Sequence, residues 1–184
     1  METIRLSTWI DAPVERCFKL ATSIDLHLVS AAVTGEKVIG GVTSGLLSAG
    51  DTVQWQGRHF GREFTHTSRI DQWRPYSCFR EVMVEGHFLR FEHEHHFALM
   101  DDGTRMRDEV RFAVPCGSLG RLAAKTVLRR HLIWMLKERN AVLRRVAESE
   151  EWRKYLEPTA ETVKPFRTQE KSRAAAWDRS AVLR

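Results

Sequence analysis

Hydrophobic and polar residues alternate from the beginning of the chain. One face of this extended segment carries Ile4, Leu6, Thr8 and Ile10. A period of two is typical of a strand, so the pattern predicts a β-strand over residues 2–11 with one buried side. Asp11-Ala12-Pro13 follows, and an acidic cap candidate with a proline near the first turn indicates a helix start. A second short helix is expected to begin at Ser23.

The next segment is short and rich in small residues. Residues 36–42 have the pattern of a short strand, and residues 43–50 form a loop that contains Leu46 and Leu47. Because two exposed leucines would be unfavourable, we expect this loop to cover an apolar surface.

Five strand-like runs then follow one another closely. They span residues 51–60, 62–73, 77–85, 87–99 and 104–114. Turn residues separate the runs, and Asp101-Asp102-Gly103 is a hairpin signal. Successive strands joined by tight turns predict an antiparallel sheet.

The period changes to that of a helix after Pro115. Over residues 118–148 the apolar stripe consists of Leu128, Leu132, Leu136, Leu143 and Ala147. A helix of about 30 residues would be about 45 Å long and needs a whole curved sheet to cover it. The sequence therefore predicts an α+β domain in which six to seven antiparallel strands wrap around a long C-terminal helix.

The last part of the chain has a different character. In residues 150–184 the apolar residues are scattered, and Pro158 and Pro165 interrupt them. We expect residues 1–149 to form one ligand-binding domain and residues 150–184 to form a tail that is disordered or loosely docked.

Charge and cysteine content narrow the class of protein. The chain has 29 Lys and Arg against 24 Asp and Glu, and the small excess is spread along it, which argues against a nucleic-acid partner. Contact of the basic helix with an anionic membrane is the less favoured alternative.

Three widely spaced cysteines suggest neither a disulfide framework nor a zinc motif. With no apolar leader or membrane-length run, a cytoplasmic protein is expected.

Histidine is the unusual residue type. Four of the eight histidines fall within residues 87–96, and two more are His59 and His66. Because strand side chains alternate between faces, His93 and His95 should share the interior face with apolar neighbours. That interior face is predicted to include Leu89, Phe91, Phe97 and Leu99 on one strand, Met106, Asp108, Val110 and Phe112 on the next, and Val53, Trp55, His59, Phe64, His66 and Ile70 on an earlier pair. A tip at Asp102-Gly103 would place Phe97 opposite Asp108 and His95 opposite Val110.

An apolar wall with a few polar groups is the usual form of a small-molecule site. The predicted ligand contacts are Trp55, His59, Phe64, His66, Phe91, His93, His95, Asp108, Phe112 and Trp134. Trp134 could instead sit in a dimer contact, and the pattern fits a monomer or a homodimer equally.

The polar groups on this wall have other interpretations. The histidines and Asp108 could form only a satisfied buried network. His93, His95 and Asp108 are the candidates for acid–base catalysis. A metal shared by His93 and His95 with His66 or Asp108 is less favoured, so we expect neither a metal nor a cofactor.

Several segments together resemble a known superfamily. They are Asp11-Ala12-Pro13, the stretch from Gly50 to Trp55 leading to His59-Phe60-Gly61, the strand from Phe88 to Phe97, and Asp108-Glu109-Val110 before Pro115, Gly117, Gly120 and an arginine-rich helix. Over residues 1–148 the chain resembles the START/polyketide-cyclase (SRPBCC) superfamily, particularly bacterial cyclase/dehydrase-like proteins.

The resemblance implies the helix-grip fold, with two short helices after the first strand and a cavity between helix and sheet. It implies no catalytic motif at numbered positions. We therefore expect the protein to bind a small hydrophobic or aromatic molecule that is lipid-, quinone- or polyketide-like. The alternative is a cyclase/dehydratase-type enzyme that uses a His/Asp pair of the cavity for proton transfer.

Overall fold

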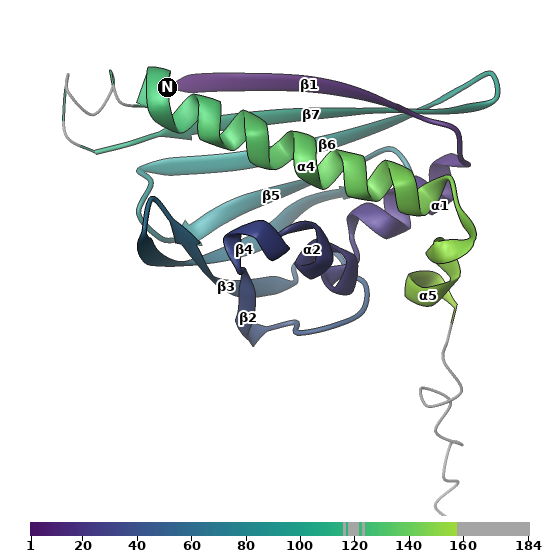
Figure 1. The fold of residues 1–184 in the computed structure, drawn as a ribbon, viewed down its shortest axis with the longest axis horizontal. Coiled ribbons are helices and arrows are strands. Elements are labelled where there is room, and N and C mark those ends of the chain that lie inside the picture. The colour runs from purple at the N-terminus through teal and green to yellow at the C-terminus, as the bar shows by residue number, and fades with distance from the viewer. Residues whose placement is uncertain (116, 118–121, 123, 158–184) are drawn as a thin grey trace, which may run out of the picture.

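The computed structural model describes residues 1–115, 117, 122 and 124–157, and contains one antiparallel sheet of seven strands. The strands are β1 (Glu2–Ile10), β2 (Lys37–Gly41), β3 (Thr52–His59), β4 (Arg62–Arg74), β5 (Cys78–Glu85), β6 (Arg90–Met100) and β7 (Gly103–Ala113). Their order is β1-β7-β6-β5-β4-β3-β2, so the first strand pairs with the last (Figure 1). The predicted sheet is confirmed.

Two short helices, α1 (Val14–Ala21) and α2 (Ile24–Ser30), follow β1, and the 3-10 turn η1 (Ala32–Thr34) follows α2. Ser23 caps α2, because its hydroxyl accepts a hydrogen bond from the Leu26 backbone N–H. The expected cap at Asp11 is wrong. Pro13 occupies the N-cap position of α1 without a side-chain hydrogen bond, and the Asp11 backbone N–H instead donates to Glu148.

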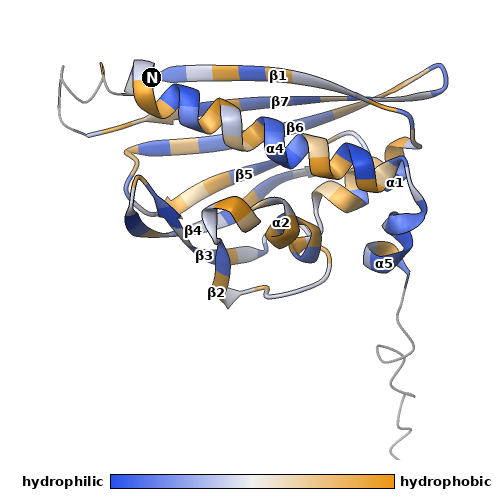
Figure 2. Ribbon diagram, in the orientation of Figure 1, coloured by the Kyte–Doolittle hydropathy of each residue, from blue (hydrophilic) through white to orange (hydrophobic). Residues whose placement is uncertain are grey.

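The long helix α4 (Arg129–Ala147) lies across the concave side of the sheet beside α1 and α2 (Figure 1). It has 19 residues and is preceded by the π-helical turn η2 (Ala124–Leu128), so helical structure covers residues 124–147 of the predicted 118–148. The remainder of the expected helix, residues 118–121 and 123, is outside the described residues. Figure 2 shows hydrophobic segments between hydrophilic ones along α4. This pattern is expected for a helix with one apolar face, as the sequence predicted.

The described part of the predicted tail packs against the domain. Residues 150–157 form η3 (Glu150–Trp152) and α5 (Arg153–Leu156), and Trp152, Tyr155 and Leu156 pack on the core. The Arg16 guanidinium lies 4.5 Å from the centre of the Trp152 ring. These apolar residues therefore dock a short helix on the domain. Residues 158–184 of the predicted tail are outside the described residues.

The β6–β7 hairpin corrects one predicted register. Asp101 and Asp102 form the two-residue loop, so His95 pairs with Asp108 and Phe97 pairs with Met106. The prediction was wrong by two residues, because it placed the tip at Asp102-Gly103. A shift of two residues preserves the alternation of faces, and therefore every inward assignment on β7 is still correct.

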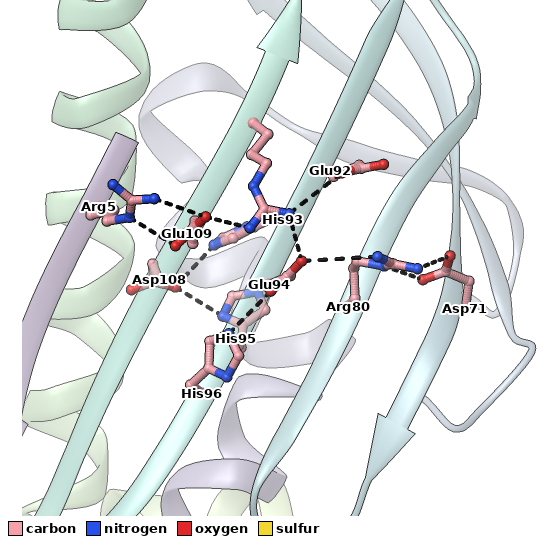
Figure 3. Close-up of polar contacts among 11 residues, drawn as sticks. Arg5, Asp71, Arg80, Glu92, His93, Glu94, His95, His96, Asp108 and Glu109 are labelled. Atoms are coloured by element: carbon pink, nitrogen blue, oxygen red, sulfur yellow. Dashed lines mark hydrogen bonds and ion pairs between the residues drawn. The ribbon is translucent and has the colours of Figure 1, made fainter. Parts of the chain in front are cut away.

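The ends of β6 depart from the predicted inward face. Leu89 and Leu99 are 72% and 70% exposed, because Leu89 precedes the strand and Leu99 lies near the hairpin turn, beyond the packed core. The outer face of the sheet carries paired charged side chains. A ladder of ion pairs runs across it through Arg5, Glu109, Arg111, Glu94, Arg80 and Asp71 (Figure 3).

The loop over residues 43–50 covers the core through one of its two leucines. Leu47 is 8% exposed and belongs to the core, whereas Leu46 is 40% exposed. Two of the three cysteines, Cys17 and Cys78, are buried free thiols, and Cys116 is outside the described residues. Burial raises the pKa of Cys17 to about 11, so this thiol is unreactive at neutral pH.

Candidate functional site

A cavity of about 470 Å³ lies between the concave face of the sheet, the segment from α2 to η1, and α4. Its wall is mainly apolar and includes Phe64, Met83, Phe88, Phe91, Val110, Val114, Leu128, Leu132, Met135 and Leu136. Val33, Phe60 and Val127 also line it, although each is more than half exposed. These three residues therefore mark the opening. The volume is within the usual range of about 300–1,000 Å³ for small-molecule sites.

Seven of the ten predicted ligand contacts lie on the cavity wall. They are Trp55, His59, Phe64, His66, Phe91, His93 and Trp134. The other three, His95, Asp108 and Phe112, face the interior but do not reach the wall. Phe112 is fully buried in a cluster with Leu136, and Asp108 is covered by Asn140. Both covering residues come from α4, which lies close to this part of the sheet.

Histidines from helices extend the polar part of the wall. His27 on α2 contacts the Glu36 carboxylate through its Nε2, at 2.9 Å from Oε2, and its ring packs on Trp55. His131 on α4 lies with its Nε2 at 3.2 Å from the Nδ1 of His59. Burial alone would raise the pKa of Glu36, but the hydrogen bond from His27 and the nearby imidazoles lower it. Strand alternation could not have revealed His27 or His131.

A second group of polar residues on the cavity wall comes from the sheet and from α4. The Trp55 indole N–H donates to the Ser68 hydroxyl at 3.1 Å, which satisfies a buried donor. Glu81 faces the cavity from β5, and Arg139 faces it from α4. Burial raises the pKa of Glu81, but Arg139 and the Ser68 hydroxyl outweigh burial and hold the pKa at about 2. Glu81 is therefore a carboxylate at neutral pH.

A compact buried cluster lies beside the wall, centred on Asp108 (Figure 3). His93 Nε2 lies 2.9 Å from Asp108 Oδ1, and the Asn140 amide donates to Asp108 Oδ2 at 2.7 Å. Burial and the neighbouring His93 lower the pKa of His95 to about 3. Burial raises the pKa of Asp108, but the hydrogen bond from His93 and the close imidazole of His95 keep it well below its ordinary value. The cluster therefore combines a carboxylate with a neutral His95 imidazole.

Acidification should destabilise the fold in two stages. Burial lowers the pKa of His66 below 6.5, so the unfolded chain binds more protons as the pH falls through about 6.5, and the free energy of unfolding decreases. The pKa of Glu36 is below 4.5, so a further loss follows as the pH falls below about 4.5. Urea unfolding at a series of pH values measures both stages. The His66→Gln variant should lose part of the first stage, and unchanged stability between about pH 8 and pH 5 would contradict the assignment.

No family model and no curated protein matches the sequence. Solved structures do match the fold. The protein TTHA0849 from Thermus thermophilus has a TM-score of 0.62 and 20% sequence identity, over 77% of this chain and 97% of that chain. The Zhui aromatase/cyclase from Streptomyces sp. R1128 has a TM-score of 0.62 and 13% identity, over 81% of this chain and 97% of that chain.

A further match is the di-domain aromatase/cyclase StfQ from the steffimycin biosynthetic pathway. It has a TM-score of 0.65 and 11% identity, over 81% of this chain and 51% of that chain. These likenesses, with the observed sheet and long helix, define a helix-grip fold. The resemblance to SRPBCC proteins is thus confirmed at the level of fold, and the fold alone does not define a function. None of the described helices has the length and hydrophobicity needed to span a membrane.

Proposed function

We propose that the protein binds a small, largely apolar molecule in the cavity between the sheet and α4. The observation that carries this proposal is the cavity itself, about 470 Å³ with a mainly apolar wall and a few convergent polar groups. Aromatic side chains on the wall, including Trp55, Phe64 and Phe91, suit a ligand with rings or a lipid-like chain. The imidazoles of His59 and His66 can donate to or accept from a ligand oxygen. Quinone-, lipid- and polyketide-like molecules share this chemistry.

Native mass spectrometry of the untagged protein tests this proposal. We expect a discrete excess mass in the gently desolvated protein that is absent after denaturation, and an organic extract that contains the released compound. If no compound is retained, titration with the neutral apolar fluorophore N-phenyl-1-naphthylamine should still give saturable binding of one molecule. Absence of both would contradict the proposal.

The proposal also includes a cytoplasmic location. The buried free thiols of Cys17 and Cys78 fit a reducing compartment.

A second candidate function is proton transfer of the cyclase or dehydratase type. The observation that favours it is the His93 imidazole, which lies on the cavity wall and 2.9 Å from the buried carboxylate of Asp108. Asp108 would orient the imidazole, and the other imidazole nitrogen would exchange a proton with a ligand carbonyl or hydroxyl group. Asn140 would in turn hold the carboxylate.

The His93→Gln variant tests this second function. With a poly-β-ketone thioester as substrate, we expect turnover to fall by about 100-fold or more, the usual contribution of general acid–base catalysis. Binding of N-phenyl-1-naphthylamine should be largely retained, because most of the apolar wall is unchanged. Equal turnover by the variant and the wild-type protein would eliminate this role.

A further inference from the structure

Strand alternation and register bring three metal-ligating side chains together. His93 and His95 are two residues apart on β6, so they project from the same face of the sheet. Asp108 lies on β7 directly opposite His95, and β6 and β7 are hydrogen-bonded neighbours. The sequence alone did not favour a metal here, because it did not establish the cross-strand order that would bring His66 or Asp108 to the two histidines.

The donor atoms of the three side chains converge on a small volume. His93 Nε2 and His95 Nδ1 each lie 2.9 Å from the same Asp108 Oδ1 atom (Figure 3). One donor atom from each residue lies within 4.8 Å of the other two. The three residues are 4%, 2% and 1% exposed, so solvent competes little for these atoms.

Hydrogen bonding within the protein does not account for His95. The contact of its Nδ1 with Asp108 lacks the geometry of a hydrogen bond, and neither ring nitrogen has another partner among the described residues. Leaving a buried polar group unsatisfied is unfavourable, and native proteins generally avoid it. A cation held between the two imidazoles and the carboxylate would give a partner to His95 while retaining His93 and Asp108.

The surroundings also suit a metal centre. Asn140 Nδ2 donates to Asp108 Oδ2 at 2.7 Å, which orients the carboxylate and leaves Oδ1 directed at the imidazoles. Ligating carboxylates are usually held by such second hydrogen bonds. His93 lies on the cavity wall, so a further coordination position can open toward the cavity.

From this geometry we infer that His93, His95 and Asp108 form a binding site for a divalent transition metal, of which zinc fits two imidazoles and one carboxylate best. The site would present its open position to the cavity. The inference goes beyond the binding of a small molecule in the cavity. It does not depend on that binding, because the three metal-ligating side chains and Asn140 all belong to the protein.

Metal titration of the untagged protein tests the site directly. After treatment with a chelator and its removal, we expect one equivalent of Co²⁺ to produce the visible absorption bands of a low-coordinate site, and Zn²⁺ to displace it. His95→Ala and Asp108→Asn should each weaken Co²⁺ binding by at least about 100-fold, because they remove direct ligands. The matched control is His96→Ala. His96 neighbours His95 but contacts Glu94 instead of the cluster, so this variant should bind like the wild-type protein.

The same experiment can overturn the inference. If the wild-type protein binds no stoichiometric Co²⁺ or Zn²⁺, or if His96→Ala weakens binding as much as His95→Ala, the cluster is not a metal site. X-ray absorption spectroscopy of the zinc-loaded wild-type protein avoids any effect of substitution on folding. It should show scattering from two imidazoles, and a spectrum with no imidazole scattering would also overturn the inference. Ligand binding, followed separately with N-phenyl-1-naphthylamine, distinguishes failure of this site from failure of the cavity.

Discussion

Replacement of Phe18 by alanine should lower the free energy of unfolding by about 3–5 kcal/mol, the range for removing a buried aromatic ring from a core. Phe18 on α1 is 2% exposed and makes edge-to-face contacts with four aromatic rings of the sheet side. Their centroids are 5.0–5.7 Å away, and the rings belong to Trp73, Tyr76, Phe79 and Phe97. The loss would be a large part of the total stability of a typical domain, which is about 5–15 kcal/mol.

Urea denaturation followed by circular dichroism measures this loss. The matched control is Phe60→Ala, which removes the same ring at the β3–β4 turn, where Phe60 is 59% exposed. We expect it to cost less than about 1 kcal/mol. Similar losses for the two variants would show that α1 does not pack on the sheet as described.

The sequence predicted the faces of the strands better than their pairing. Alternation of side chains depends only on the backbone of one strand, so the inward set on β7, including Met106 and Asp108, could be derived locally. The register of β6 and β7 depends on which two residues form the turn. Asp101-Asp102-Gly103 offers two choices, and only the packing of both strands decides that Asp101 and Asp102 form it.

In the candidate site, too, the sequence predicted the face of each side chain better than its surroundings. His59, His66 and His93 were predicted to face a ligand, and they line the cavity. The depth of each side chain depends on which residue of α4 lies above it, and no local pattern specifies that. Asn140 therefore covers Asp108, although the sequence assigned Asp108 to the ligand-facing wall. Helix residues such as His131 also line the wall. Predicting them would have required the position at which α4 crosses the sheet.

Filling the cavity should abolish ligand binding without unfolding the protein. Met83 on β5 lies on the cavity wall and is half-buried, and a Met83→Trp substitution would place a larger, rigid ring in the space proposed for the ligand. We expect the affinity for N-phenyl-1-naphthylamine to fall by about 100-fold, since each 1.4 kcal/mol of lost binding is about tenfold and the ring would exclude several apolar contacts. Fluorescence titration at constant temperature measures the change.

The neighbouring residue provides the matched control for this substitution. Val84 lies on the opposite face of β5, is 49% exposed and is not on the cavity wall. A Val84→Trp substitution introduces the same ring on the same strand, so it should leave the affinity for the fluorophore within about twofold of the wild-type value, as expected for a surface site. Because Met83 and Val84 differ chiefly in the face they occupy, equal affinities for the two variants would mean that the fluorophore binds outside the cavity, and the proposed binding function would then lose its structural basis.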